Sequence, residues 1–362
     1  MDRTSEEAVD AARSSAAELL RLRGELSAAV VAREFDERPE LDERFGPQGR
    51  ERCLEDASRH VDYLATAVAQ QSPSLFNDYV EWATVLLGRL GIPDEDVRRN
   101  LMILRDMLKE KLGADDAMEP QRVIDGALQR LTRTPAEPAT FLDAGPHAGL
   151  ARRYLDALLR QDRRTATSLV TDAVESGVPV RDIYLHVFQP VQYEVGRLWQ
   201  IGEIGVAEEH YCTAATQVIM ARLYPYVFGS RSNGRRMVAA CVDGDLHEIG
   251  LRMIADFFEM DGWDSAFIGA STPPSSLVKL ILADPPDLLA ISATMTFHVR
   301  MVAEIIAQVR RRVPDVRIIV GGYPFRVEPE LWRRVGADAV AADAEEAVER
   351  ARRLFEADTD AA

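Results

Sequence analysis

An aspartate and a histidine two positions apart are the residues best suited to chemistry in this chain. In the stretch AACVDGDLHEIGLRM, residues 239 to 253, an apolar run leads into Asp245, His247 and Gly250. Side chains two apart in an extended loop point the same way, so Asp245 can hold one imidazole nitrogen while the other faces a ligand. Such a carboxylate partner is typical of a metal-binding histidine. The alternative is a loop histidine that only caps the next helix.

A single histidine does not build a metal site from protein ligands alone. A metal ion at His247 would therefore arrive inside its own macrocycle. Gly250, with no side chain, would let a bulky planar group approach the start of the helix.

The elements that position His247 follow from an alternating pattern after Arg236. The apolar runs MVAACV, SAFIGA, DLLAISAT, VRIIVGG and ADAVAA alternate with amphipathic helical segments. This pattern predicts a doubly wound, Rossmann-like parallel sheet of five strands over residues 233–358. Ligands of such sheets bind at the carboxyl ends of the strands, where His247 would lie.

Helical patterns fill the chain before the predicted sheet. Residues 1–45 are expected to form a partly flexible helical arm, and residues 46–132 an all-helical module. A Pro- and Gly-rich linker follows over 133–148. Four helices with short connections over 149–232 predict an antiparallel four-helix bundle. The predicted fold class is thus α/β plus all-α.

Composition narrows the function classes. The 362 residues are 47% hydrophobic and carry a net charge of −16, which argues against nonspecific binding to DNA or an anionic membrane. We find neither a membrane-spanning run nor a signal peptide, and expect a cytoplasmic protein. The three cysteines, Cys53, Cys212 and Cys241, are too widely spaced to suggest a disulfide framework or a zinc site.

The segment from Asp245 to Gly250 resembles the D-x-H-x-x-G signature of cobalamin-binding domains, with Leu246 inside the motif. The resemblance implies that His247 is the lower cobalt ligand and displaces the nucleotide tail of the cofactor.

Two further elements of that family occur in order. Ser292 lies at the end of a middle strand, and Gly321 and Gly322 follow the next one. Thr294 stands where the family pattern S-x-L has leucine. The resemblance implies that these residues line the slot for the dimethylbenzimidazole tail.

The predicted bundle contains LWQIGEIGVAEEHY, in which Trp199 is followed ten residues later by Glu209 and His210. This resembles the W-x9-E-H motif of CarH-type light-sensing cobalamin proteins. By that resemblance, Trp199 covers the deoxyadenosyl group of adenosylcobalamin, while Glu209 and His210 hold its ribose and adenine. An indole supplies a flat apolar lid, and a carboxylate accepts from ribose hydroxyls. The alternative reading makes Trp199 bundle core and the Glu-His pair a helix start.

The sequence does not identify the ligand of the upper cobalt position after illumination. Gln200 follows Trp199, whereas the DNA-binding photoreceptors have histidine there. His210, His186 or water would be the substitute.

The N-terminal helical module lacks the basic helix-turn-helix of those regulators, so direct DNA binding is not expected. Its architecture resembles that of photocobilins, which pair a globin-like or phycobiliprotein-like helical domain with a cobalamin unit. The resemblance implies biliverdin or another bilin as a second chromophore. Four residues are candidate bilin contacts and are equally explained as the core or surface of a small helical bundle: Cys53, His60, Tyr79 and Trp82.

These observations predict a cobalamin-dependent photoreceptor, not an enzyme, that acts as a homo-oligomer or on a signalling partner protein. The competing class is a corrinoid shuttle, a methyltransferase component that transfers methyl groups. A third reading, a sheet domain used only for protein contacts, leaves the Asp245, His247 and Gly250 set unexplained.

Overall fold

The chain divides into two compact units, Met1–Ala136 and Glu137–Ala362. The structure is a computed structural model that describes residues 3–133, 135–143 and 145–359. None of the helices in these ranges is long and apolar enough to cross a membrane.

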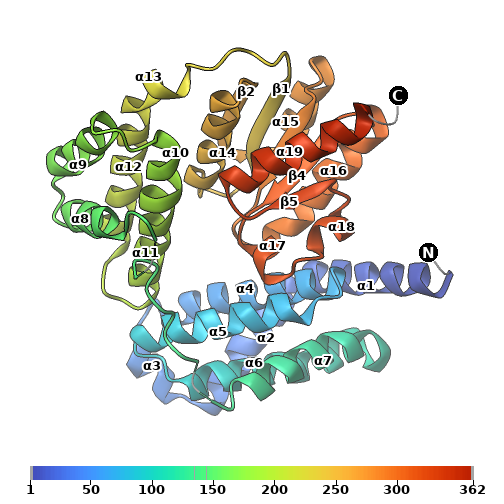
Figure 1. Ribbon diagram of the computed structural model, residues 1–362. Helices are drawn as coiled ribbons and strands as arrows, with labels where there is room; N and C mark the ends of the chain where they lie inside the picture. The colour runs from blue at the N-terminus through green and yellow to red at the C-terminus, as the bar shows by residue number, and fades with distance from the viewer. Residues whose placement is uncertain (1–2, 134, 144, 360–362) are drawn as a thin grey trace. The chain divides into compact units, whose positions relative to one another are not determined.

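In its described part, the regular elements of the first unit are all helices (Figure 1). Its helices are α1 (Arg3–Arg21), α2 (Arg23–Glu37), α3 (Glu40–Phe45), α4 (Gly49–Ala69), α5 (Pro73–Arg89), α6 (Asp94–Leu112) and α7 (Ala114–Arg130). Gly113 ends α6 with a φ of 84°, a left-handed conformation that favours glycine.

Helices α1 and α2 both contact α4 within this unit. Leu19, Leu26 and Val30 on these two helices have no exposed surface. The segment predicted as an arm therefore supplies buried side chains to the same core as the helices after it, because its narrow apolar stripe faces α4.

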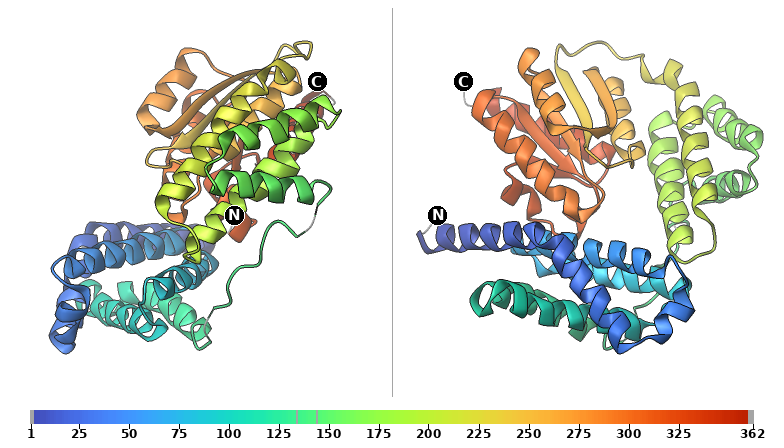
Figure 2. Two further views of the ribbon diagram at one scale, coloured as in Figure 1. Left: turned by 90° about the vertical axis from the view of Figure 1, so that its left-hand side faces the viewer. Right: turned by 180° about the vertical axis from the view of Figure 1, so that it is seen from behind.

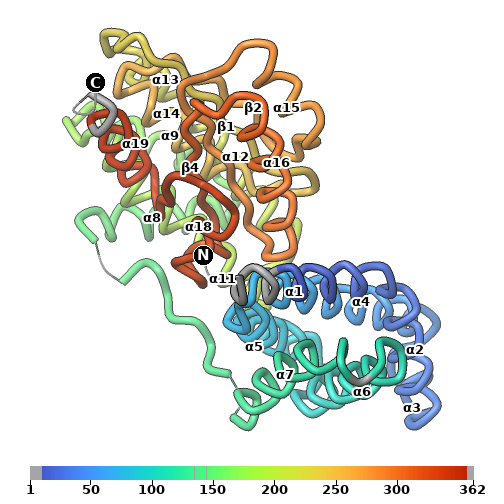
Figure 3. Tube along the Cα trace, turned by 90° about the vertical axis from the view of Figure 1, so that its right-hand side faces the viewer, coloured from blue at the N-terminus to red at the C-terminus, as the bar shows by residue number. Residues whose placement is uncertain are grey.

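Between α7 and α8 (Ala148–Leu159), the described residues form neither helix nor strand (Figure 3). The second half of this segment binds the helices that follow it. Leu142 is buried, and the Phe141 N–H donates to Glu194 Oε2 at 2.9 Å.

The second unit begins with antiparallel helices. After α8 come α9 (Arg163–Glu175), α10 (Val180–Ile183), η1 (Tyr184–Phe188), α11 (Gln189–Gln200), α12 (Val206–Arg222) and α13 (Tyr224–Val227). Segments α10, η1 and α11 form one continuous helix whose middle is a π turn, closed by a bond from the Gln189 N–H to the Tyr184 carbonyl. Pro190 explains the turn, because its ring would clash with the carbonyl four residues back in a regular α-helix.

A parallel sheet of five strands completes the second unit and confirms the predicted fold class. The strands are β1 (Arg236–Val242), β2 (Asp264–Thr272), β3 (Leu288–Ser292), β4 (Arg317–Gly321) and β5 (Ala339–Ala341). Their order is β2-β1-β3-β4-β5, and every neighbouring pair is parallel. The chain therefore continues to one side of β1 with β2 and to the other side with β3, β4 and β5. Doubly wound sheets bind ligands at the point between β1 and β3 where this direction changes.

Helices cover both faces of the sheet. Helices α14 (Ile249–Met260) and α19 (Ala344–Thr359) lie on one face, and α15 (Pro274–Ala283) and α16 (Val299–Arg312) lie on the other (Figure 1; Figure 2, right). Short helices η2 (Thr296–His298), α17 (Tyr323–Val327) and α18 (Leu331–Val335) follow β3 and β4. One buried apolar cluster runs from the bundle through α14 into the sheet, so the bundle and the sheet share a core.

Candidate functional site

The loop after β1 holds Asp245 and His247 in direct contact. Asp245 Oδ1 accepts from the His247 backbone N–H at 3.1 Å and lies 2.8 Å from the imidazole Nδ1. Because a carboxylate can only accept, this contact places the proton on Nδ1 and leaves the lone pair of Nε2 available to a metal ion. Asp245 is 1% exposed, whereas the His247 side chain is 60% exposed. The ligand atom therefore faces outward from a buried anchor.

The loop after β3 binds the other oxygen of the same carboxylate. The backbone N–H of Thr294 donates to Asp245 Oδ2 at 2.5 Å, and His298 Nδ1 lies 3.6 Å from that oxygen. Burial alone would raise the pKa of Asp245, but the bond from His247, the His298 imidazole and the Thr294 N–H hold it well below its ordinary value. Asp245 is thus a buried anion at neutral pH.

Thr294 makes this contact through its backbone, so the departure from S-x-L at this position does not affect it. His298 was missed by the sequence analysis, because its approach to Asp245 depends on β1 and β3 being neighbours. The pairing of Cys241 in β1 with Ser292 in β3 brings the two loops together.

Ser292 and the two glycines lie at adjacent strand ends. Ser292 pairs with Gly321 across β3 and β4. Gly322 has a φ of 104°, and a Cβ on it would lie 2.1 Å from the Ala293 carbonyl oxygen. Any larger residue at position 322 would push apart the loops that follow β3 and β4. Glycine therefore lets these two loops pack together beside Ser292.

The surroundings of His247 offer room and apolar surface for a flat group. A Cβ on Gly250 would have no atom within 4 Å, so the space that an approaching ring requires is open. Three large apolar side chains are exposed in the His247 loop and at the starts of α12 and α17: Leu246 by 73%, Val206 by 53% and Tyr323 by 41%. These features fit a bound corrin.

Trp199, Glu209 and His210 lie around one turn of the bundle. Trp199 is half-buried in the last turn of α11, and the Glu-His pair is in the first turn of α12, which Glu208 begins by accepting the Gly205 N–H at 2.6 Å. Glu209 Oε2 lies 2.5 Å from His210 Nδ1, and Glu209 Oε1 accepts from Thr213 Oγ1 at 3.1 Å.

The Asp245 carboxylate raises the pKa of His247 against the opposite effect of burial, and the charge of Glu209, in the first turn of α12, adds to the rise. His186, by contrast, precedes Trp199 by 13 residues in the continuous helix, roughly 20 Å along its axis. His186 instead lies beside His147, with ring centroids 6.2 Å apart, and is therefore far from Trp199.

Glu248 joins the His247 loop to two other elements. Its Oε1 accepts from Gln217 Nε2 on α12 at 2.6 Å, and its Oε2 accepts from the Ala270 N–H of β2 at 2.9 Å. This role of Glu248 was not predicted from the sequence, although a charged residue directly after His247 was a signal. Helix α12 and the loop that carries His247 are therefore mechanically connected.

The candidate bilin residues lie in the first unit on α4 and α5. His60 Nδ1 is 2.7 Å from the Tyr79 hydroxyl, and Tyr63 stacks on Tyr79 with centroids 3.6 Å apart. Burial lowers the pKa of His60 to about 4 and raises the pKa of the half-buried Cys53 thiol to about 11. Trp82 is half-buried. The structure brings His60 and Tyr79 together as a neutral buried pair, and a bilin contact at any of the four residues stays a prediction.

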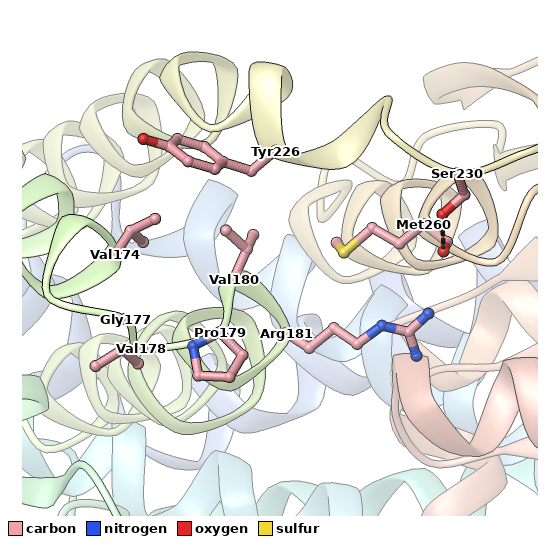
Figure 4. A pocket seen from close by; sticks show the side chains of 9 residues that line it. All are labelled: Val174, Gly177, Val178, Pro179, Val180, Arg181, Tyr226, Ser230 and Met260. Carbon is pink, nitrogen blue, oxygen red and sulfur yellow. Dashed lines mark hydrogen bonds between the residues drawn. The ribbon is translucent and has the colours of Figure 1, made fainter.

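A separate hollow of about 370 Å³ lies where the α9–α10 connection faces α13 and the end of α14 (Figure 4). Val174, Val180 and Met260 give it an apolar lining, and the Ser230 hydroxyl donates to the Met260 carbonyl at 2.6 Å. The described residues that line it include none of the predicted site residues, so it is not the site of the chemistry above.

Comparison with known proteins identifies related domains in the second unit. Residues 235–352 match a B12 binding domain, and residues 150–224 match a second domain of the same description. The chain is 25% identical to the HTH-type transcriptional repressor CarH of Myxococcus xanthus over 60% of this chain and 72% of that protein. It is 30% identical to dimethylamine corrinoid protein 3 of Methanosarcina acetivorans, over 57% of this chain and 97% of that protein.

A solved structure shows the same fold. The monomethylamine corrinoid protein of Methanosarcina barkeri superimposes with a TM-score of 0.52 and 22% identity, over 57% of this chain and 99% of that one.

Proposed function

Because the chain belongs to the family of B12-binding proteins, we propose that it is a light sensor that holds adenosylcobalamin with His247 as the lower cobalt ligand. The observation that carries the proposal is the outward-facing Nε2 of His247, which buried Asp245 orients in a loop that Glu248 bonds to Gln217 of the bundle. The likeness to a CarH repressor over 60% of the chain supports it.

The residues present fit this cofactor. His247 would bind the metal, Gly250 leaves room for the ring, and the nucleotide tail would enter beside three residues at the ends of β3 and β4: Ser292, Gly321 and Gly322. When bound, adenosylcobalamin supplies a cobalt–carbon bond that green light breaks.

On the upper side, Trp199 would cover the adenosyl group and Glu209 with His210 would bind its sugar and base. Loss of that group removes the contacts that favour one position of α12. The bond between Gln217 and Glu248 would carry the shift to the His247 loop. Light then changes the populations of two arrangements of bundle and sheet.

A methyl-transfer corrinoid protein is the second candidate. The 30% identity to a dimethylamine corrinoid protein, over 97% of its length, favours it. A shuttle must expose the upper face to a methyltransferase, whereas Trp199 and the Glu-His pair form a cover over that face. We place the sensor first for this reason.

Illumination separates the two. The protein is loaded with adenosylcobalamin in darkness and exposed to green light while absorbance and size-exclusion elution are followed. A sensor converts irreversibly to a hydroxocobalamin-like spectrum and changes its elution, as a homo-oligomer would. Preference for methylcobalamin, and exchange of its methyl group with a corrinoid methyltransferase, would overturn the sensor proposal.

We also propose that the helical N-terminal unit holds a bilin. Its all-helical architecture and the aromatic group of Tyr63, Tyr79 and His60 support this. Biliverdin added to the protein should produce a red absorbance band that His60→Leu weakens. An unchanged biliverdin spectrum would contradict the proposal. The signalling partner would then read a state set by two chromophores.

A further inference from the structure

A second imidazole approaches the carboxylate that anchors His247. His298 ends the short helix η2 and is 4% exposed. Its Nδ1 lies 3.6 Å from Asp245 Oδ2 and has no hydrogen-bond partner among the described residues. A buried polar atom without a partner is costly. The nearby anion is therefore the natural acceptor for this nitrogen.

The Phe297 ring packs edge-on against the His298 ring, with centroids 4.5 Å apart. Gly244 has no side chain, and a Cβ at that position would lie 3.5 Å from His298 Nε2. Closing the gap to Asp245 requires a movement of only about 0.6 Å to reach normal hydrogen-bond length. The ring therefore needs no new rotamer to donate.

We infer that His298 is a positioning residue that keeps the Asp245 carboxylate in the orientation that bonds His247 Nδ1. This inference rests on the proposed function, because it concerns the ligand nitrogen of the cofactor. The Thr294 N–H and His298 Nδ1 both approach Oδ2, and together they turn Oδ1 toward His247.

The consequence concerns the proton on His247. With Asp245 held, the imidazole keeps its proton on Nδ1 and presents the Nε2 lone pair. Without His298 the carboxylate can rotate, its bond to His247 weakens, and the tautomer protonated on Nε2 becomes populated. That tautomer blocks metal binding at the atom that faces the site.

Two variants test the inference. His298→Leu removes the donor, and His298→Asn restores one, because the asparagine Nδ2 is attached at the same carbon as the histidine Nδ1. His186→Leu, in the bundle away from the site, is the matched control. Circular dichroism and thermal unfolding establish that each variant folds.

The first readout needs no cofactor. In 15N-histidine-labelled apoprotein, two-bond 1H–15N spectra report the tautomer of each ring, with the His247 signals assigned from His247→Ala. We expect wild type, His298→Asn and His186→Leu to hold His247 protonated on Nδ1, and His298→Leu to show a mixture.

The second readout is axial coordination. In the 15N-histidine-labelled protein, the electron paramagnetic resonance spectrum of bound cob(II)alamin reports the His247 ligand as a 15N doublet splitting, because the benzimidazole tail of the cofactor would give a 14N triplet instead. We expect His298→Leu to bind cobalamin about tenfold more weakly, at the low end of effects seen for groups behind a metal ligand, with reduced splitting. His298→Asn should behave as wild type.

The outcomes are distinct. Absence of the 15N splitting from histidine in the labelled wild type overturns the proposed function itself. If the wild type shows the splitting and folded His298→Leu matches it in tautomer and affinity, the inference about His298 is wrong. Folded His298→Asn behaving like His298→Leu would also overturn it, because a donor at this position would then not be what matters.

Discussion

Among single residues, Asp245 has the most demanding environment. It is nearly inaccessible, yet it stays ionised because donors from two loops surround it. A buried carboxylate of this kind is favourable only while its donors remain. Asp245 therefore both orients His247 and joins the loops after β1 and β3.

Asp245→Asn should weaken cobalamin binding by about 10–100-fold, because the amide keeps the size of the side chain but loses its charge. It should also lower the free energy of unfolding by about 1.5–3 kcal/mol through weaker bonds from His247 and Thr294. Cobalamin titration and urea unfolding measure the two effects.

The pH dependence of this variant follows from the lowered pKa of Asp245. When the pKa of a carboxyl group is lower in the folded than in the unfolded state, the ionised group stabilises the protein at pH values above the unfolded pKa, near 4. This contribution is lost as the pH falls through the folded pKa. Wild type should therefore lose more stability below pH ~4 than Asp245→Asn does. Parallel curves would contradict the assignment of Asp245 as an anion.

Among the elements, the π turn contains the residue that bonds the bundle to α14, because it begins at Tyr184. The Tyr184 hydroxyl donates to Asp256 Oδ2 of α14 at 2.7 Å, and both groups are buried. Helix α14 starts directly after the His247 loop, and the helix that contains the π turn ends at the turn that bears Trp199. One hydrogen bond therefore connects the two elements that flank the proposed site.

Tyr184→Phe should lower the free energy of unfolding by about 1–3 kcal/mol, because it leaves a buried carboxyl group without its donor. The matched control is Tyr154→Phe, which loses a bond to Thr216 inside the bundle. Urea unfolding should show the smaller loss for the control. Equal losses would mean that the contact with α14 has no special weight.

Burial raises the pKa of Asp256 to about 6, despite the bond from Tyr184. A raised carboxyl pKa means that stability falls as pH rises from about 4 to the folded value and is flat above it. Removing the Tyr184 donor raises this pKa further. The decline should extend to higher pH in Tyr184→Phe than in wild type.

The buried pair of His60 and Tyr79 joins helices α4 and α5. Its effect on stability changes with pH in the direction opposite to that of Asp256. The pKa of His60 is lowered to about 4 by burial, so stability present above pH ~6.5 is lost as pH falls toward the folded value. We expect a loss of about 3 kcal/mol over this range, from 1.36 kcal/mol per pKa unit. Urea unfolding across pH should show a smaller loss in His60→Gln, and an unchanged loss would contradict the assignment.

Across the whole molecule, each unit has its own core, and within Glu137–Ala362 the bundle and sheet share one. This sharing lets a change at the bundle turn reach the sheet. The bond from Gln217 to Glu248 is a direct route from the bundle to the His247 loop, because Glu248 is adjacent to His247.

Gln217→Leu should keep dark binding of adenosylcobalamin but reduce the light-driven change in the 243–248 loop. Hydrogen exchange in darkness and after green light measures this change in the loop and in α12. Gln192→Leu, which loses a bond to Thr216 within the bundle, should respond as wild type does. A full light response of the loop in Gln217→Leu would show that the signal takes another route.

The sequence by itself determined the fold class and the place of His247 in it. Alternating apolar runs and amphipathic helices, with glycine at helix ends such as Gly113, are local patterns, and local geometry follows from them. The Asp245 to His247 spacing also acts locally, since both residues belong to one short loop.

Only the tertiary structure decided what surrounds that pair. The Thr294 N–H, the His298 ring and the Gln217 side chain come from segments far from that pair in the sequence. A backbone N–H donor such as that of Thr294 also cannot be recognised from the type of residue. Their approach depends on β1 and β3 being neighbours and on the bundle sharing a core with α14. Strand order and shared burial arise from the packing of the whole unit, which no local spacing encodes.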